Sequence, residues 1–207
     1  MSPLRTDGLR IGITQRRVPA SAHAMERDAL DAAWSGWFTD HWPAANFLTI
    51  PNFPRPELAL RHVQDWGVNA LVLSGGEDIG SSPARDAVES ALLDYACQHR
   101  LPVLGVCRGM QLLHTQAGGV LTPQPGHVGT PHRVSCGQQA MTVNSWHRFG
   151  ITSLQPGWHA LAVSENGGIE AMQHASLPWL GLMWHPERAQ GNPAPMWRWI
   201  AAMFASS

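Results

Sequence analysis

An apolar run at residues 101–106, Leu-Pro-Val-Leu-Gly-Val, leads directly into Cys107, and glycines stand two positions before and two positions after that cysteine. A short apolar run of this kind is typical of a strand buried in a parallel sheet. Residues 109–116 continue with helical spacing until two glycines end the helix. A tight strand-to-helix turn needs small residues such as Gly105 and Gly109, since a Cβ there would collide with neighbouring strands. The segment therefore predicts an α/β fold that presents Cys107 as a nucleophile at the end of a central strand.

Strands and helices alternate through the first half of the sequence. Short β-branched or apolar runs bounded by turn residues are typical of parallel strands, and the segments between them carry apolar residues at helical spacing. This order predicts a central, mostly parallel sheet flanked by helices. We expect strands at residues 9–14, 47–50, 70–73 and 102–106, and helices at residues 25–38, 56–66, 85–99 and 109–116.

The second half has a different pattern. Its short apolar runs are separated by Pro-Gly and Asn-Gly-Gly turns, which are typical of antiparallel strands. The chain shows no internal repeat or linker, and its length suits one compact unit. We therefore expect a single domain over residues 1–207 with an antiparallel extension. Its expected elements are strands at 139–143, 159–163, 169–172 and 179–183 and a last helix at 195–204.

Charge and hydropathy narrow the choice of partners. The formal net charge is -1 at pH 7, all 14 basic residues are arginine, and no basic cluster is longer than Arg16-Arg17. Nucleic-acid-binding surfaces are usually strongly basic, so we expect no nucleic acid partner. No run of about 18 apolar residues marks a membrane span, and residues 1–15 lack the pattern of a signal peptide. We expect a cytoplasmic protein with no membrane partner that acts on a small molecule.

Cysteine usage argues against a disulfide framework and against a cysteine-based metal site. The chain has three cysteines, Cys97, Cys107 and Cys136, and none of them forms a CxxC pair. We expect Cys97 and Cys136 to be packing residues, because an isolated cysteine most often behaves as a small hydrophobe. On this basis we expect no metal and no cofactor.

A thiol nucleophile needs an imidazole base and a group that orients the base. Among the 11 histidines, His185 follows an apolar strand and precedes a proline, which holds its backbone extended. Side chains two residues apart in an extended chain point the same way, so Glu187 can reach one ring nitrogen while the other faces Cys107. The position of Cys107 at a helix N-terminus favours the thiolate and directs the N–H of Arg108 at a developing oxyanion.

Several motifs together resemble the class I glutamine amidotransferase fold, in particular its gamma-glutamyl hydrolase branch. They are the segment around Cys107, the His-Pro-Glu motif and the double-glycine loop at residues 73–78, with further matches at 13–16, 85–86, 143–147 and 169–171. Residues 26–34 and 50–52 also resemble the N-terminal part of gamma-glutamyl-CDP-amidate hydrolases. The resemblance implies a flavodoxin-like α/β fold over nearly the whole chain.

The resemblance also implies an activity. Cys107 would attack the side-chain carbonyl of a gamma-glutamyl group, His185 would protonate the departing amine, and Glu187 would hold the imidazole. Water would then release glutamate from the thioester. The N–H groups of Gly76 and Arg108 would bind the oxyanion. The expected contacts to the glutamyl group come from Gln111, Asn144, Ser145, Trp146 and His147, although Trp146 is larger than the aromatic residue typical of the family at that position.

Two other functions use the same fold. One is a glutaminase subunit that supplies ammonia from glutamine to a partner synthetase, and the other is a catalytically silent binding module. Arg16 and Arg17 follow the first strand, where loops line the site of an open α/β sheet, so they are candidates to face an anionic leaving group, and at least one of them is expected to be a solvated surface residue. Trp197 and Trp199 suit either a core position or the contact of a homodimer.

Overall fold

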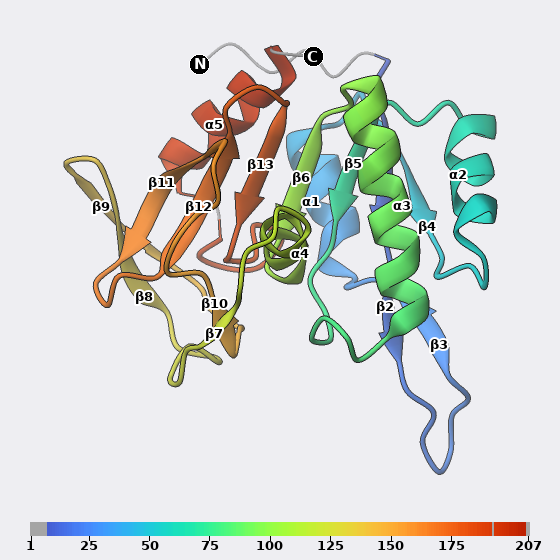
Figure 1. The fold of residues 1–207 in the computed structure, drawn as a ribbon, viewed down its shortest axis with the longest axis horizontal. Helices are drawn as coiled ribbons and strands as arrows, with labels where there is room; N and C mark the ends of the chain where they lie inside the picture. Colours follow the sequence, from blue (N-terminus) through green and yellow to red (C-terminus); the bar gives the residue numbers. More distant parts are fainter. Residues whose placement is uncertain (1–7, 192, 206–207) are drawn as a thin grey trace.

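The computed structural model describes residues 8–191 and 193–205 of the 207-residue chain. The two ends of the domain expected at 1–207, including the first seven residues of the segment searched for a signal peptide, lie outside the described residues. A nine-stranded sheet forms the centre of the fold, in the order β4-β1-β5-β6-β13-β12-β11-β8-β9 (Figure 1). Its strands are β1 (Arg10–Thr14), β4 (Asn46–Ile50), β5 (Ala70–Leu73), β6 (Val103–Val106), β8 (His132–Cys136), β9 (Gln139–Val143), β11 (Trp158–Ser164), β12 (Ile169–His174) and β13 (Trp179–Leu182).

The sheet has a parallel half and an antiparallel half. Strands β4, β1, β5, β6 and β13 run parallel. Strands β12, β11, β8 and β9 continue the sheet, and each is antiparallel to the strand before it. The predicted fold, a mostly parallel α/β sheet with an antiparallel extension in the second half, is confirmed.

Five helices in the described part of the chain cover the two faces of the sheet (Figure 1). Helices α2, α3 and α4 lie on one face, and α1 and α5 lie on the other. None of these helices combines the length and apolar character needed to cross a membrane. Their bounds are α1 (Ala33–His41), α2 (Pro56–Asp65), α3 (Pro83–His99), α4 (Arg108–Gln116) and α5 (Ala194–Ala205).

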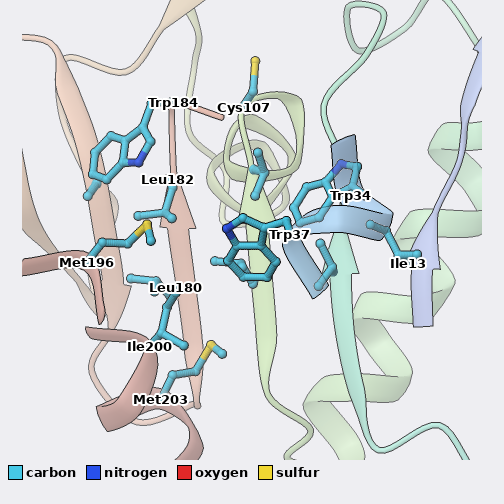
Figure 2. Packing of buried hydrophobic residues seen from close by; sticks show 14 of the residues in the cluster. Ile13, Trp34, Trp37, Cys107, Leu180, Leu182, Trp184, Met196, Ile200 and Met203 are labelled. Carbon is cyan, nitrogen blue, oxygen red and sulfur yellow. The ribbon is translucent and has the colours of Figure 1, made fainter. Parts of the chain in front are cut away.

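The parallel strands contribute side chains to two separate cores. Successive residues of a strand point to opposite faces. Ile11 and Ile13 belong to the core under α1 and α5, whereas Leu71 and Leu73 belong to the core under α2, α3 and α4. Figure 2 shows the first core, where tryptophans of α1 and apolar side chains of α5 pack against the sheet. Burial on both faces explains why the strand sequences are continuously apolar.

Two tryptophans of α5 pack against the rest of the protein. The ring of Trp197 stacks on Trp37 of α1 with the two ring centroids 5.8 Å apart. The ring of Trp199 lies 6.2 Å from that of Trp184. Both tryptophans are partly buried against the first core. Of the two roles that the sequence allowed them, the structure shows the core role, and a homodimer remains a prediction.

The helix expected at residues 25–38 is wrong in its first part. Strand β3 (Arg27–Ala29) pairs instead with β2 (Arg16–Val18), and α1 begins only at Ala33. Arg17 stands opposite Asp28 in this hairpin, with Nε 3.0 Å from Oδ1. Asp31 accepts a hydrogen bond from the Ala33 N–H at 3.1 Å, which satisfies a free donor at the helix start. Cross-strand ion pairing and this capping contact therefore override the local helical spacing.

The strand pairing of the second half was predicted incompletely. Strand β9 matches the strand expected at 139–143, but its hairpin partner β8 was not predicted. A short pair formed by β7 (Thr122–Pro123) and β10 (Phe149–Gly150) was also missed. These segments are only two to five residues long, which is too short for a clear period of buried and exposed positions.

Candidate active site

Cys107 lies in the turn between β6 and α4, and its backbone is strained. Its φ of 52° and ψ of -104° fall outside the regions that residues with a side chain usually adopt. A Cβ on Gly105 would lie 2.7 Å from the carbonyl of Gly109, and a Cβ on Gly109 would lie 2.2 Å from the Leu73 oxygen. The two glycines therefore permit the close packing of this turn, as the sequence predicted. Figure 2 shows the Cys107 sulfur pointing beyond the end of the strand, away from the core.

His185 reaches Cys107 from the neighbouring strand. Strands β6 and β13 are parallel with Val106 opposite Leu182, and the Cys107 N–H donates to the Leu182 oxygen at 2.7 Å. The chain after β13 therefore emerges beside the nucleophile, and the side chain of His185 lies close enough to Cys107 for the two groups to interact. His185 Nδ1 lies 2.7 Å from Glu187 Oε1. The three side chains predicted to form the triad thus lie together.

The surroundings of His185 favour its protonated form. Burial alone would lower the pKa of this imidazole, but the hydrogen bonds and charges of Cys107 and Glu187 raise the pKa to about 9. Gly75 makes room for the ring, because a Cβ there would lie 2.6 Å from His185 Cε1. A charged imidazolium held beside a thiol is the arrangement needed to activate a cysteine nucleophile and to protonate a leaving group.

Asn144 fixes the backbone of His185. Its Oδ1 accepts a hydrogen bond from the His185 N–H at 2.9 Å, and its Nδ2 donates to the His185 oxygen at 2.8 Å. Nδ2 also donates to the Ala189 oxygen at 3.0 Å. Sequence analysis predicted a substrate contact for this residue. The structure shows that its side chain is engaged in positioning the proposed base.

The double-glycine loop after β5 is held by Arg85 of α3. The guanidinium donates to the Ser74 oxygen at 2.8 Å, and its Nη1 lies 2.9 Å from Glu77 Oε2. Gly76 has a φ of +155°, and a Cβ on it would lie 2.3 Å from Arg85 Nη1. Glycine is therefore required at 76, where the loop approaches Arg85 closely. Gly76 lines the same cavity as Cys107 and as Arg108, which is the other residue of the predicted oxyanion site.

A buried ion network joins this loop to the turn at Cys107. Glu89 is completely buried, pairs with Arg85 at 3.1 Å and also pairs with Arg108, which in turn contacts Asp86. Burial alone would raise the pKa of Glu89, but Arg85 and Arg108 lower it below the usual value for a glutamate. No role in the site was expected for Arg85 and Glu89 from the sequence. Their spacing of four residues on one helix was the available signal.

Cys107 opens onto a cavity of about 970 Å³. Gln111, Trp146 and His147 also line this cavity, as expected for substrate contacts, whereas Ser145 is not part of the lining and its hydroxyl donates to the His127 oxygen. Gln111 donates to the Phe149 oxygen at 2.8 Å from its place one turn along α4. His185 and Glu187 line a smaller adjoining cavity of about 260 Å³. A ligand in the larger cavity would contact the Cys107 thiol, while the His185 imidazole approaches that thiol from the smaller cavity.

Comparison with known proteins decides the family. Residues 48–196 match the family model of class I glutamine amidotransferases. The chain belongs to this family. The resemblance derived from its motifs is therefore confirmed.

Relatives of this chain differ in the activities that their names give. It is 29% identical over 188 residues to gamma-glutamyl-CDP-amidate hydrolase from Campylobacter jejuni, a match that covers 87% of this chain and 91% of the relative. It is 27% identical over 169 residues to a subunit of the glutamine-hydrolysing GMP synthase from Thermococcus kodakarensis, covering 74% and 82%. A solved structure from Thermoplasma acidophilum, assigned provisionally as a GMP synthase subunit, has a TM-score of 0.72 at 19% identity and covers 96% of this chain and 94% of its own.

Several arginines line the larger cavity, and they differ in whether their charge is already paired. Arg17 pairs with Glu26 and Asp28, and Arg148 pairs with Asp78. Arg16 is exposed, lines both cavities and forms no ion pair within residues 8–191 and 193–205. Of the two arginines that sequence analysis placed at the site, Arg16 is therefore the one whose charge is available to a ligand.

Proposed function

We propose that this protein hydrolyses a gamma-glutamyl amide through a cysteine thioester and releases glutamate and an amine or amidate. The observation that carries the proposal is the arrangement of Cys107, His185 and Glu187 beside a cavity of about 970 Å³. The hydrogen bond from His185 to Glu187 leaves the other ring nitrogen for the thiol and the substrate. The Cys-His-Glu triad is thus the chemical basis of the proposed reaction.

The first step forms the thioester. The Cys107 sulfur attacks the side-chain carbonyl carbon of the glutamyl group, and the carbonyl oxygen becomes an oxyanion. The backbone N–H groups of Gly76 and Arg108 bind this oxyanion in the proposed mechanism. The C–N bond then breaks as protonated His185 gives its proton to the leaving nitrogen.

The second step releases glutamate. Neutral His185 takes a proton from a water molecule, which attacks the thioester carbon. The C–S bond breaks, the sulfur leaves as thiolate, and the imidazole is again protonated. Glu187 stabilises the charged imidazole in both steps and does not itself accept the proton.

The leaving group is proposed to be anionic. Arg16 lines both cavities and has no ion-pair partner among the described residues, and a Cβ on Gly76 would lie 2.9 Å from the Arg16 Cβ. A phosphate-bearing amidate would bring the complementary charge. The similarity over 87% of the chain to a gamma-glutamyl-CDP-amidate hydrolase supports the same choice.

A panel of substrates tests this function. Gamma-glutamyl-CDP-amidate, a neutral gamma-glutamyl anilide and glutamine would each be incubated with the enzyme, with glutamate release followed by mass spectrometry. We expect the amidate to be cleaved with the highest kcat/KM. Arg16→Gln should lower kcat/KM for the amidate by about tenfold, the loss of one charge-assisted contact, and leave the anilide unaffected. Arg27→Gln, an exposed arginine of β3, is the matched control.

Two results would contradict the proposal. Failure to release glutamate from any amide would remove the hydrolase function. An equal effect of Arg16→Gln on the charged and the neutral substrate would remove the proposed contact to the leaving group but not the hydrolysis.

A glutaminase that serves a synthetase is the second candidate. The similarity to part of a glutamine-hydrolysing GMP synthase favours it, since the same triad can hydrolyse glutamine and supply ammonia to a synthetase. In that case free glutamine would be the best substrate, and a partner synthetase would increase its turnover. Ammonia release from glutamine, measured against glutamate release from the amidate, separates the two functions.

A further inference from the structure

Three histidines and one glutamate converge beside the larger cavity, which His147 also lines, and outside the triad. They are His127 and His147 from two loops, His132 at the start of β8, and Glu170 of β12. One ligand atom from each of His127, His132 and Glu170 lies within 4.8 Å of the other two. His147 lies against the same carboxylate. Imidazole nitrogens and carboxylate oxygens are common ligands of borderline transition metals.

The separations match those of ligands that share one metal ion. Glu170 Oε1 lies 3.3 Å from His132 Nε2, 3.6 Å from His147 Nε2 and 3.9 Å from His127 Nδ1. His127 Nδ1 lies 3.3 Å from His147 Nε2. A tetrahedral Zn²⁺ ion with bonds of about 2.0–2.1 Å places its ligand atoms about 3.3–3.4 Å apart. The ligand atoms of His127, His132 and Glu170 lie within 4.8 Å of one another, and His147 Nε2 is close to two of them, so a movement of the His147 ring would complete the set.

The cluster is buried, and some of its polar atoms lack hydrogen-bond partners among the described residues. Glu170 is 1% exposed, and the ion-pairing groups around it in the described part of the chain are all imidazoles. Its Oε2 and both ring nitrogens of His132 have no partner with hydrogen-bond geometry among the described residues. A buried carboxylate without a fixed cation is costly, so a bound cation would stabilise this arrangement.

The outer hydrogen bonds orient one ring for binding and hold a second ring in place. His147 Nδ1 lies 3.0 Å from the Phe149 oxygen and donates to it, which leaves the Nε2 lone pair facing Glu170. Asn166 Nδ2 donates to His127 Nε2 at 3.0 Å, and Asn166 Oδ1 accepts from the Ser164 hydroxyl at 2.6 Å. An imidazole that accepts at Nε2 carries its proton on Nδ1, so metal binding through His127 Nδ1 requires the ring proton to move to Nε2 and the Asn166 amide to rotate. Such outer contacts are a regular feature of metal-binding histidines.

We propose that His127, His132, His147 and Glu170 bind one divalent transition metal ion, with Zn²⁺ as the best match to the ligand set. The four protein ligands complete a tetrahedron, so the ion has a structural role. The loop residues Val128 and Trp146, which follow His127 and precede His147, form a β-bridge and both line the larger cavity. The ion would fix the wall that faces the substrate. This site was not expected, because the sequence argument against a metal considered only cysteine ligands.

Metal titration tests the site without reference to catalysis. The protein is prepared without a histidine tag, treated with a chelator, and titrated with Co²⁺ and Zn²⁺. We expect one ion per chain, the intense visible absorption of four-coordinate Co²⁺, its loss on addition of Zn²⁺, and a Tm that rises with Zn²⁺ concentration. His132→Gln and Glu170→Gln should abolish the Co²⁺ spectrum. His159→Gln is the control, since His159 is exposed and lies outside the cluster.

Several results of the metal titration would overturn the proposed site. No absorption and no Tm rise in the unsubstituted protein would overturn the proposal and leave Glu170 paired only with an imidazolium. Binding that survives in both variants, or that is lost equally in His159→Gln, would also overturn it. Because the decisive measurement uses the unsubstituted protein, a variant that fails to fold does not affect the test.

Discussion

The side-chain amide of Asn144 forms two hydrogen bonds with the backbone of His185, accepting from its N–H at 2.9 Å and donating to its carbonyl oxygen at 2.8 Å. We expect Asn144→Ala to lower kcat by on the order of 10- to 100-fold with little change in KM, because the proposed base loses its position and the substrate keeps its contacts. Steady-state kinetics on the best gamma-glutamyl amide measure both constants.

Asn144→Asp provides the matched variant. It keeps the acceptor for the His185 N–H and loses the donor to the His185 oxygen, so its kcat should lie between those of the alanine variant and the unsubstituted enzyme. A rise in KM with kcat unchanged would instead support the substrate contact that sequence analysis predicted for Asn144.

Replacement of the proposed nucleophile should abolish turnover without unfolding the protein. Cys107→Ala removes only a sulfur atom from a side chain that is 5% exposed, and we expect kcat to fall by about 10⁴-fold or more. Cys97→Ala, at an exposed position, should keep full activity. Glutamate release and the Tm of both variants are the measurements. Near-normal turnover of Cys107→Ala would show that the reaction uses another residue.

The raised pKa of His185 predicts a specific pH dependence. The imidazole should stay protonated up to a pH of about 9, and NMR of its ring nitrogens would follow the titration. Because Cys107 supplies part of the increase, Cys107→Ser should lower this pKa. A folded-state pKa above the unfolded value stabilises the protein fully below pH about 6.5, and this stabilisation is lost as pH rises through 9.

Stability measurements complete that test. The free energy of unfolding of the unsubstituted protein should fall between pH 6.5 and 9 by on the order of a few kcal/mol relative to His185→Gln. If the free energy of unfolding changed with pH in the same way for both proteins over this range, the imidazole would not be held protonated in the folded state.

The buried ion network should contribute strongly to stability. Glu89→Gln leaves the buried Arg85 and Arg108 short of a countercharge, and we expect a loss of about 3–5 kcal/mol in the free energy of unfolding. Glu165→Gln breaks the exposed pair with Arg133 and should cost less than about 1 kcal/mol. Urea denaturation of the two variants compares them directly, and equal small losses would contradict the role given to the network.

The sequence was most informative where local chemistry determines structure. The parallel strands are buried on both faces, so their apolar runs were recognisable, and the turn at Cys107 was predicted because only glycine fits at 105 and 109. The His-Pro-Glu motif likewise predicted the pairing of His185 with Glu187, which needs only an extended backbone.

Features that depend on distant residues were not predictable in the same way. Residues 27–29 form a strand because Asp28 pairs with Arg17 across a hairpin, although their local spacing suits a helix. Asn144 acts on a residue 41 positions away, and its amide alone does not reveal whether it binds substrate or backbone. The convergence of Glu170 with three histidines likewise depends on the pairing of β8 and β11.

The place of β13 in the sheet also has a consequence for how the chain folds. It is the last strand in the described part of the sequence, yet it lies between β6 and β12 and joins the parallel and antiparallel halves. Until residues 179–182 are inserted, both halves of the sheet expose an unpaired edge strand, and such strands can pair with other chains and promote aggregation. A nascent or truncated chain that lacks β13 also has its thiol without its imidazole. Cys107 and His185 are therefore expected to come together only when β13 is inserted into the sheet, so that an incompletely folded chain carries no active nucleophile.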